Sequence, residues 1–486
     1  WDHDNSSASL LIDATINGAP RKLLAQPSKQ GWLYVFDRVT GQPIWPIPEV
    51  AVPQTNMPTE KTAATQPIPT NPPPYSLTYI KESDLIDFTP ALRAQAPTPS
   101  LSGLWDAAVV VNGLEIPFRF EIAGAGPSIN GSFFNGDEKV LSTGGTFENG
   151  SLVLTFDHYA TSVEATLVNG RLAGTYNRAT GFYPFYARRF APPAAFANEV
   201  PAIDGLWQIG GVKSSKGEAA WRFIVRQAGA EVTAAILRVD GDTGALAGTY
   251  RNGKFIVSHF SGARPLVLEL TPTKDGNLEI VRNREEKMVA VRATEAKLKD
   301  VPEPTDPSRH SSVKDPTEPF KFAFPDITGK VLSNSDERFR NKVVIVSISG
   351  SWCPNCHDEA PFLAELYRKY RGKGLEIVAL SFEEEAQKAK GYPRLRAFNQ
   401  RYGVDYPVVL AGEQADLAEK VPQIHNLNSF PTTIFLGRDG LVRSVHAGFA
   451  GAVSGVFHNN AKEEITANVE RRHVDDHPGP LSIIVS

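Results

Sequence analysis

The sequence predicts a multidomain fold in which antiparallel β modules precede a C-terminal α/β domain. Three observations support this prediction: a repeat with many hairpin turns, a buried-strand pattern that leads into a helical pattern, and polar, proline-rich segments between them. The chain has 486 residues. At about 100–200 residues per domain, this length has room for roughly two to four domains.

The repeat covers residues 97–296 and contains two copies of one series of motifs. Gly103-Leu104-Trp105 recurs at 205–207, and Gly145-Thr146-Phe147 returns at 248–250 with nearly the same spacing. Asn-Gly and Asp-Gly pairs adjoin short alternating stretches in both copies, which indicates tight β-hairpins. We therefore expect two antiparallel β modules, each a small barrel or sandwich, at residues 97–195 and 196–296.

Several large side chains of the two modules allow more than one interpretation. The aromatic ones could line a ligand pocket, but aromatic residues in small β domains are more often core, and we expect the core role. Two arginines recur at matching places, and a solvated strand face explains them as well as a binding site does. The residues concerned are Trp105, Phe133, Tyr159, Tyr183, Trp221, Arg119 and Arg222.

Composition is that of an ordinary soluble protein, with 41% hydrophobic and 21% charged residues and a net charge of −4. This mild acidity gives no reason to expect nucleic acid or anionic membranes as partners. No apolar run approaches the ~18–20 residues that a membrane helix needs. The chain begins at Trp1, so the sequence does not reveal whether a targeting segment or membrane anchor exists.

Cys353 and Cys356 are the only cysteines of the chain. Two thiols three residues apart are too few for a disulfide scaffold or a four-ligand zinc site, but they suit a dithiol–disulfide cycle. The β-branched run 343–349 precedes them, and apolar residues at helical spacing follow them. Cys353 should lie at a helix N-terminus, where a thiolate is stabilised, and act as the nucleophile. Cys356 should be the resolving thiol, and no metal or cofactor is expected.

Residues 318–472 resemble the TlpA-like thiol–disulfide oxidoreductases of the thioredoxin superfamily. The resemblance rests on Trp352-Cys353-Pro354-Asn355-Cys356, on the hairpin-like 320–330 and on 429–436 followed by Asp439-Gly440. It implies an α/β thioredoxin fold, a cis bond before Pro431 beside the cysteines, and an exported, periplasmic-type location. It also implies partners with thiols or disulfides and an upstream redox donor or acceptor. The direction of electron flow stays open.

Three further residues are interpreted through this resemblance. Glu359 matches an acid that would tune proton transfer at the buried thiol, although a helix-surface glutamate is an equal alternative. Ser347 stands where thioredoxins proper carry a buried Asp, which favours a specialised member of the superfamily. Trp352 could contact partners or cap the core. A peroxiredoxin-like Pro-x-x-x-Thr-x-x-Cys pattern fits neither cysteine, so we expect no peroxidase activity.

Residues 1–96 resemble a piece of a PQQ-dependent dehydrogenase of the glucose/quinate type. The resemblance rests on Trp1-Asp2-His3-Asp4, on 33–41 and on the Pro-rich run at 65–74; it implies Asp2 as general base and Lys29 as a contact of the quinone. A propeller buries its blades against one another, and this segment holds little more than one blade. We therefore expect an incomplete β-propeller segment without working dehydrogenase activity.

Two connecting segments complete the organisation. Residues 297–317 are polar and Pro-rich, as in a semi-stiff linker, and residues 473–486 should form a frayed tail. The function predicted is thiol–disulfide exchange with envelope partner proteins. The alternatives are a PQQ-dependent dehydrogenase and a β-module binding protein with an accessory redox domain.

Overall fold

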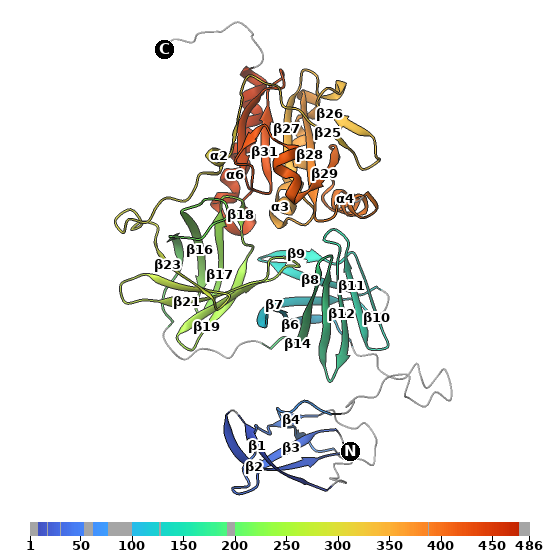
Figure 1. Ribbon diagram of the computed structural model, residues 1–486, viewed down its shortest axis with the longest axis vertical. Coiled ribbons are helices and arrows are strands. Elements are labelled where there is room, and N and C mark those ends of the chain that lie inside the picture. Colours follow the sequence, from blue (N-terminus) through green and yellow to red (C-terminus); the bar gives the residue numbers. More distant parts are fainter. Residues whose placement is uncertain are drawn as a thin grey trace, which may run out of the picture. The chain divides into compact units, whose positions relative to one another are not determined.

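The structure is a computed structural model that describes residues 8–16, 18–29, 31–52, 62–75, 100–125, 128–191, 200–386 and 388–475. The chain divides into two compact units, residues 1–97 and 98–486, and each is described by itself. The second unit contains both β modules and the C-terminal α/β domain (Figure 1).

The N-terminal unit is built from short antiparallel strands around a small core. One sheet has the order β1-β2-β3, and β4 and β5 form a separate ribbon. Leu23, Ala25 and Val35 form its buried cluster. Asp2 lies outside the described residues. The strands are β1 (Leu10–Ile16), β2 (Ala19–Pro27), β3 (Leu33–Asp37), β4 (Glu49–Ala51) and β5 (Thr65–Pro67).

The first β module is an antiparallel meander that curls until its last strand pairs with its first. Each strand pairs with the next from β10 to β14, β14 pairs with β6, and the ladder continues through β7 and β8 to β9. The Ser142 N–H donates to the Gly131 carbonyl, which brings the start of β10 beside β8. The strands are β6 (Gly103–Val111), β7 (Leu114–Ala123), β8 (Asn130–Asn135), β9 (Glu138–Leu141), β10 (Gly144–Glu148), β11 (Ser151–Phe156), β12 (Thr161–Val168), β13 (Arg171–Arg178) and β14 (Gly181–Arg189).

The second β module repeats this topology and closes fully. β23 pairs with β15, and β16 pairs with both β15 and β17, so the ladder returns to its start; between the alternatives of barrel and sandwich, the module is a barrel. Short β18 occupies the place that β9 has in the first copy. The strands are β15 (Gly205–Gly210), β16 (Ala220–Ala228), β17 (Glu231–Arg238), β18 (Gly241–Asp242), β19 (Leu246–Arg251), β20 (Lys254–His259), β21 (Leu266–Pro272), β22 (Leu278–Arg282) and β23 (Glu286–Arg292).

The two barrels share part of their core. Phe260 of the second module packs among the aromatic rings of the first, 4.9 Å from Phe118 and 5.0 Å from Tyr176 between ring centroids. The Tyr176 hydroxyl also donates to the Gly262 carbonyl at 2.6 Å. Because these contacts are buried and well packed, the barrels form one continuous body.

The repeated tryptophans have equivalent environments in the two copies. Trp105 Nε1 donates to the Leu101 carbonyl, and Trp207 Nε1 donates to the Ile203 carbonyl, both at 2.9 Å. Arginines cover both rings: Arg189 lies 4.4 Å from the centroid of Trp105, and a second lies 3.9 Å from that of Trp207. Of the seven side chains singled out in the sequence, Trp105, Phe133, Tyr159 and Trp221 are buried.

The C-terminal domain is a five-stranded mixed sheet of order β29-β28-β27-β31-β32, accompanied by helices. β27, β28 and β29 are parallel, whereas β31 and β32 run antiparallel to their neighbours (Figure 1). Every residue of β27 and β28 is buried, as expected for central strands. The elements are β25 (Ala323–Pro325), β26 (Val331–Ser333), β27 (Val343–Ser349), α3 (Pro354–Tyr370), β28 (Leu375–Glu383), α4 (Lys388–Tyr402), β29 (Val408–Glu413), α5 (Leu417–Lys420), β31 (Thr432–Leu436), β32 (Val442–Ala447) and α6 (Val456–Asp475).

Two boundaries differ from those read in the sequence. Part of the segment expected to be a linker, 297–317, folds onto the C-terminal domain: α2 (Pro307–His310) is followed by β24 (Ser312–Val313), which pairs with β30 (Ile424–His425). α6 continues to Asp475, past the expected tail boundary at 473. Among the described residues, no helix is long and apolar enough to cross a membrane.

Removing the Trp207 side chain should destabilise the barrel body. The ring is 2% exposed, so Trp207→Ala leaves a cavity and should lower the free energy of unfolding by about 3–5 kcal/mol. Urea unfolding sampled by pulse proteolysis measures the loss. Leu298, which is 87% exposed, gives the control: Leu298→Ala should cost less than about 0.5 kcal/mol. Equal stability of the two variants would contradict this role for Trp207.

Candidate functional site

The two cysteines lie where a buried strand passes into a helix. β27 ends at Ser349, and Cys353 is the N-cap of α3, with Pro354 as its first helical residue. The Cys356 N–H donates to Cys353 Sγ at 3.2 Å. This amide donor and the positive end of the helix dipole favour negative charge on the Cys353 sulfur.

Both cysteines are free thiols and are almost completely covered. Cys353 is 0% exposed and Cys356 is 1% exposed. Burial raises the pKa of Cys356 well above its usual range, and the hydrogen bond with Cys353 and the charges of Cys353 and Glu359 add to this. The Cys356 thiol therefore holds its proton at neutral pH and needs an acceptor before it can act as a nucleophile.

Glu359 is a buried acid held between strand and helix, not a helix-surface residue. Its carboxylate accepts hydrogen bonds from Ser347 Oγ at 3.0 Å and from Thr433 Oγ1 at 2.7 Å, and it is 1% exposed. Burial raises the pKa of Glu359 to about 7, although these two hydrogen bonds and nearby His446 lower it in part. A carboxyl group with this pKa can give or take a proton near neutral pH.

A cavity of about 10 Å³ is lined by both the buried acid and the buried thiol. Glu359, Cys356 and the side chains of Ser347 and Ser381 are among its lining residues. This volume is close to that of a single water molecule, and the polar lining supplies hydrogen-bond partners for one. The acid and the thiol therefore border the same small, partly polar cavity.

Trp352 directly precedes Cys353, and Phe430, which precedes Pro431, shares a buried cluster with both cysteines. The Phe430–Pro431 bond is cis, and the Pro431 carbonyl accepts from the Gly448 N–H at 2.7 Å. The Trp352 ring packs edge-on against Phe430 at 5.1 Å, and its Nε1 donates to the Phe382 carbonyl at 2.7 Å. Trp352 thus links the loop before α3 to the loop that carries Pro431.

A second buried network fixes the backbone just before Cys353. Glu383 is 0% exposed and accepts hydrogen bonds from the Ser351 N–H at 2.9 Å and from Ser381 Oγ at 2.7 Å. His357 Nδ1 pairs with the Tyr402 hydroxyl and its Nε2 with the Ser351 carbonyl, each at 2.7 Å. Burial lowers the pKa of His357 well below its usual range, so the ring is neutral.

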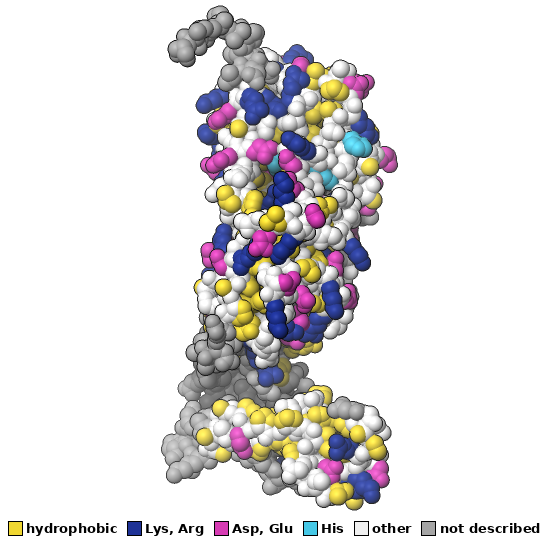
Figure 2. Space-filling model, turned by 90° about the vertical axis from the view of Figure 1, so that its left-hand side faces the viewer, with side chains coloured by type: hydrophobic (Ala, Val, Ile, Leu, Met, Phe, Trp, Pro, Cys, Tyr) yellow, Lys and Arg dark blue, Asp and Glu magenta, His cyan; other side chains and the backbone are white. Residues whose placement is uncertain are grey.

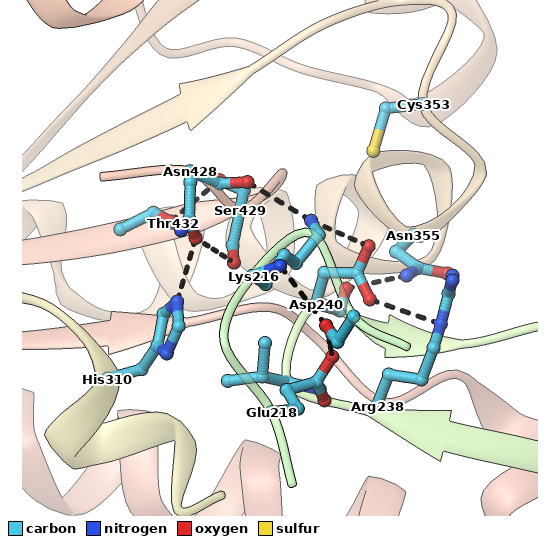
Figure 3. Close-up of polar contacts among 12 residues, drawn as sticks. Lys216, Glu218, Arg238, Asp240, His310, Cys353, Asn355, Asn428, Ser429 and Thr432 are labelled. Carbon is cyan, nitrogen blue, oxygen red and sulfur yellow. Dashed lines mark hydrogen bonds and ion pairs between the residues drawn. The ribbon is translucent and has the colours of Figure 1, made fainter. Parts of the chain in front are cut away.

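Sequence reasoning missed the residues that reach the dithiol from the second barrel. Asn355, between the cysteines, donates through Nδ2 to the Asp240 carbonyl at 2.6 Å (Figure 3). Lys216 Nζ donates to the Asn428 carbonyl at 3.1 Å and pairs with the Asp240 carboxylate at 2.9 Å. More than a hundred residues separate Asp240 from Asn355, and no local pattern in the sequence signals such a contact.

The described residues offer neither a metal site nor a quinone site. No group of three or more His, Cys, Asp or Glu residues among them could hold a metal ion. Lys29, expected to contact a quinone, lies exposed in a turn, and Asp2 is outside the described part. One small sheet and a ribbon do not supply the enclosing walls of a propeller centre, so the described donors do not fit PQQ.

Comparison with known proteins gives two family matches. Residues 316–445 match the AhpC/TSA family, and residues 1–101 match the β-propeller domain of the glucose/ethanol/alcohol dehydrogenase family. The C-terminal domain is thioredoxin-like. This confirms the fold predicted from the cysteine motif and from 429–436, and the second match agrees with the quinoprotein resemblance of residues 1–96.

Curated relatives share the C-terminal domain. The chain is similar to thiol-disulfide oxidoreductase ResA of Bacillus thuringiensis (strain Al Hakam), with 31% identity over 121 residues, which is 25% of this chain and 62% of the relative. It is 29% identical over 137 residues to ResA of Bacillus subtilis (strain 168), or 28% of this chain and 69% of the relative. The first match thus spans less than two thirds of the relative's length.

Solved structures of related description also align with the C-terminal part. A putative thiol:disulfide interchange protein DsbE from Chlorobium tepidum aligns over 33% of this chain and 99% of its own, with 22% identity and a TM-score of 0.27. A secreted Mycobacterium tuberculosis disulfide oxidoreductase aligns over 31% and 95%, with 16% identity and a TM-score of 0.24.

Glu359 should make stability depend on pH. Its folded pKa of about 7 exceeds the usual 4.5, so the stabilisation is present below pH 4.5 and is lost as pH rises through 7. The free energy of unfolding should fall by about 3 kcal/mol over this range relative to Glu359→Gln. Pulse proteolysis in urea at several pH values measures the difference. The exposed Glu365→Gln on the same helix is the control, and an identical pH profile for Glu359→Gln and the wild type would contradict the assignment.

Proposed function

We propose that this protein is a thiol–disulfide oxidoreductase that exchanges disulfides with partner proteins through Cys353 and Cys356. The observation that carries the proposal is the dithiol at the N-terminus of α3, with a buried acid one helical turn beyond the second cysteine. The similarity of this domain to proteins named ResA supports the same activity.

In the first step, the Cys353 thiolate attacks one sulfur of a partner disulfide. A bond forms between Cys353 Sγ and that sulfur, the partner's S–S bond breaks, and the second partner sulfur leaves as a thiolate that takes up a proton. The Cys356 N–H, which donates to Cys353 Sγ, holds the nucleophile at the helix end. The product is a mixed disulfide.

In the second step, Cys356 resolves the mixed disulfide. Its proton passes toward the Glu359 carboxylate, and its sulfur attacks Cys353 Sγ. The bond between Cys353 and the partner breaks, and the partner sulfur that was bonded to Cys353 leaves as a thiolate and takes up the proton that Cys356 gave up. The partner gains two electrons and two protons, and the protein keeps a Cys353–Cys356 disulfide. A thiol-bearing redox protein then regenerates the dithiol by the reverse steps. Alternatively, the protein acts as an oxidant and the whole cycle runs in the opposite direction.

Glu359 suits this proton transfer because it lines the same small cavity as Cys356. Its pKa of about 7 lets the carboxyl group accept and return a proton at physiological pH without a large energetic cost. Pro431 and Trp352, which the Trp352–Phe430 ring contact brings close together, are proposed to shape the surface that partners contact.

We further propose an exported, periplasmic-type location, on the resemblance of residues 318–472 to envelope oxidoreductases. The partners would be envelope proteins bearing thiols or disulfides. Figure 2 shows positive and negative side chains interspersed over the face in view, in keeping with a net charge of −4 and with protein rather than nucleic-acid partners.

The two cysteines should give opposite results when replaced. Cys353→Ser should abolish disulfide exchange, because no nucleophile remains at the helix N-terminus. Cys356→Ser should stop turnover but trap the partner as a mixed disulfide on Cys353, visible as a covalent adduct on a non-reducing gel. Insulin reduction measures turnover. Full activity in both variants would refute the proposed function.

The direction of electron flow can be measured directly. Equilibration of the dithiol with glutathione gives its reduction potential. A value near −270 mV, roughly that of thioredoxin, would indicate a reductant, and one near −120 mV, roughly that of DsbA, an oxidant. Comparison of the Glu359→Gln variant with the wild type tests whether the buried acid assists the step in which Cys356 resolves the mixed disulfide.

A further inference from the structure

The dithiol lies under a cover built from the chain itself. A nucleophilic sulfur must be reached by a partner disulfide, yet Cys353 is 0% exposed. The neighbouring Asn355 is 1% exposed and donates to a backbone carbonyl of the second barrel, that of Asp240. The segment 239–242, which follows β17 and includes β18, therefore lies directly over the Cys-x-x-Cys turn.

This segment also contacts the loop that follows β32. Gly241 forms a parallel β-bridge with Phe449, and the Gly451 N–H donates to Asp242 Oδ2 at 2.6 Å. The Gly448 N–H donates to the Pro431 carbonyl. A Cβ added at Gly448 would lie only 2.3 Å from the Val239 carbonyl oxygen, so the backbones of Gly448 and Val239 are in close contact. The segment thus makes backbone contacts on the side of the dithiol that carries Pro431.

Side chains of the second barrel hold the segment in its conformation. Glu218 accepts a hydrogen bond from the Val239 N–H at 2.7 Å. Lys216 and Arg238 flank the Asp240 carboxylate. Burial alone would raise the pKa of Asp240, but these two cations lower it overall. Lys216 additionally reaches Asn428, whose side chain pairs with His310 (Figure 3). The segment is therefore preformed by its own barrel.

Further residues of the barrels lie close to the cysteines. Arg264 Nη1 donates to the Asp242 carbonyl at 3.3 Å. Burial alone would lower the pKa of Arg264, but the charges of Cys353, Asp240 and Cys356 raise it overall. From the first barrel, the Tyr159 ring lies 4.2 Å from that of His357.

The equivalent hairpins of the two repeats meet at this place. The Ala245 N–H of the second barrel donates to Asn135 Oδ1 in the β8–β9 turn of the first at 2.8 Å. Burial raises the pKa of Asp358 in α3 well above its usual range, and the carboxylates of Asp242 and Glu138, one from each hairpin, add to this. Both copies of the repeat thus contribute to the cover over α3.

We propose that the barrel body is an intramolecular cover of the dithiol, in which segment 239–242 occupies the surface that a partner polypeptide must contact. Exchange with a protein disulfide then requires this body to undock from the C-terminal domain. The contacts are mostly polar, as in interfaces that form and break reversibly. The inference rests on the proposed function, because it concerns access to the same two sulfurs.

The proposal also defines what a partner would contact once the cover has left. The Asn355 amide and the Gly451 N–H are donors that segment 239–242 satisfies with a backbone carbonyl and a carboxylate. A partner segment with an extended backbone, a small residue opposite Asn355 and an acid one position later would replace these interactions. Binding of such a segment competes directly with closure.

The test compares variants that weaken closure with matched controls in the full-length protein. A Cβ at Gly241 would lie 2.3 Å from the Phe449 carbonyl oxygen and 2.4 Å from Asn355 Nδ2, so Gly241→Val should prevent docking. Gly276→Val is the control, because Gly276 has a similarly positive φ but no atom within 4 Å of its Cβ position. Lys216→Ala removes the hydrogen bond to Asn428 across the interface and the ion pair with Asp240 within the barrel, and exposed Lys213→Ala is its control.

The probe is a maleimide that carries a polyethylene glycol chain, applied in a Cys356→Ser background so that only Cys353 reacts. Loss of one hydrogen bond from a charged group should favour opening by a factor of about ten, so Lys216→Ala should speed labelling about tenfold. Gly241→Val should speed it at least as much. The two controls should stay within about twofold of the parent.

The outcomes distinguish a failure of the proposed cover from a failure of the proposed thiol–disulfide exchange. Equal labelling rates in the parent and Lys216→Ala would overturn the cover, as would equal rates in a Gly241→Val protein with native circular dichroism. If Gly241→Val fails to fold, Lys216→Ala decides alone, because its site is partly exposed. Faster labelling without insulin reduction in the variants that retain both cysteines would refute the proposed function and leave the cover standing.

Discussion

The burial of two sulfur atoms at one helix N-terminus is the constraint on which the rest of the C-terminal domain depends. A buried thiol loses its proton with difficulty, so Cys356 needs an acceptor that is buried with it. We propose Glu359 as that acceptor, and its carboxyl group must itself be neutralised or hydrogen-bonded to stay buried. Ser347 and Thr433 provide those hydrogen bonds from β27 and β31, so the sheet supports the acid that serves the helix.

Local patterns in the sequence were sufficient for the centre of the site. The run 343–349 and the helical spacing after Cys356 placed the cysteines at a strand-to-helix turn, because both signals lie within a few residues of the motif. The same reasoning left Glu359 undecided between surface and interior. The burial of Glu359 depends on which face of α3 packs against the sheet. The significance of Ser347 becomes clear only from the hydrogen bond that its hydroxyl donates to the Glu359 carboxylate. In this site the carboxylate that Ser347 contacts belongs to the helix.

The long-range contacts could not be predicted in this way. The repeat in the sequence identified two β modules, and turn chemistry placed their hairpins, but the closure of the second barrel depends on pairing between β16 and β17 and between β15 and β23. The contact between Asp240 and Asn355 depends on how one folded body meets another. Neither residue stands out in the sequence, since an Asp-Gly turn is an ordinary hairpin signal and Asn355 is simply one of the two residues between the cysteines. Residues 307–313 were misread for the same reason: their polar, Pro-rich composition hides a short helix and a strand, and the strand pairs with β30.

The cover and the buried acid depend on one another physically. Water that reached α3 would hydrate the Cys353 thiolate and the carboxyl groups near it, and the electrostatic interactions among them would weaken. In the closed state the barrel body excludes that water, and burial and the Asp242 carboxylate, which accepts from the Gly451 N–H, both raise the pKa of Asp358 in α3. Opening therefore does more than admit a partner, because it changes the dielectric environment in which the sulfur atoms ionise. A partner segment that replaces 239–242 excludes water again at the moment when the mixed disulfide forms. Recognition of the partner is thereby linked to the ease of proton transfer between Cys356 and Glu359.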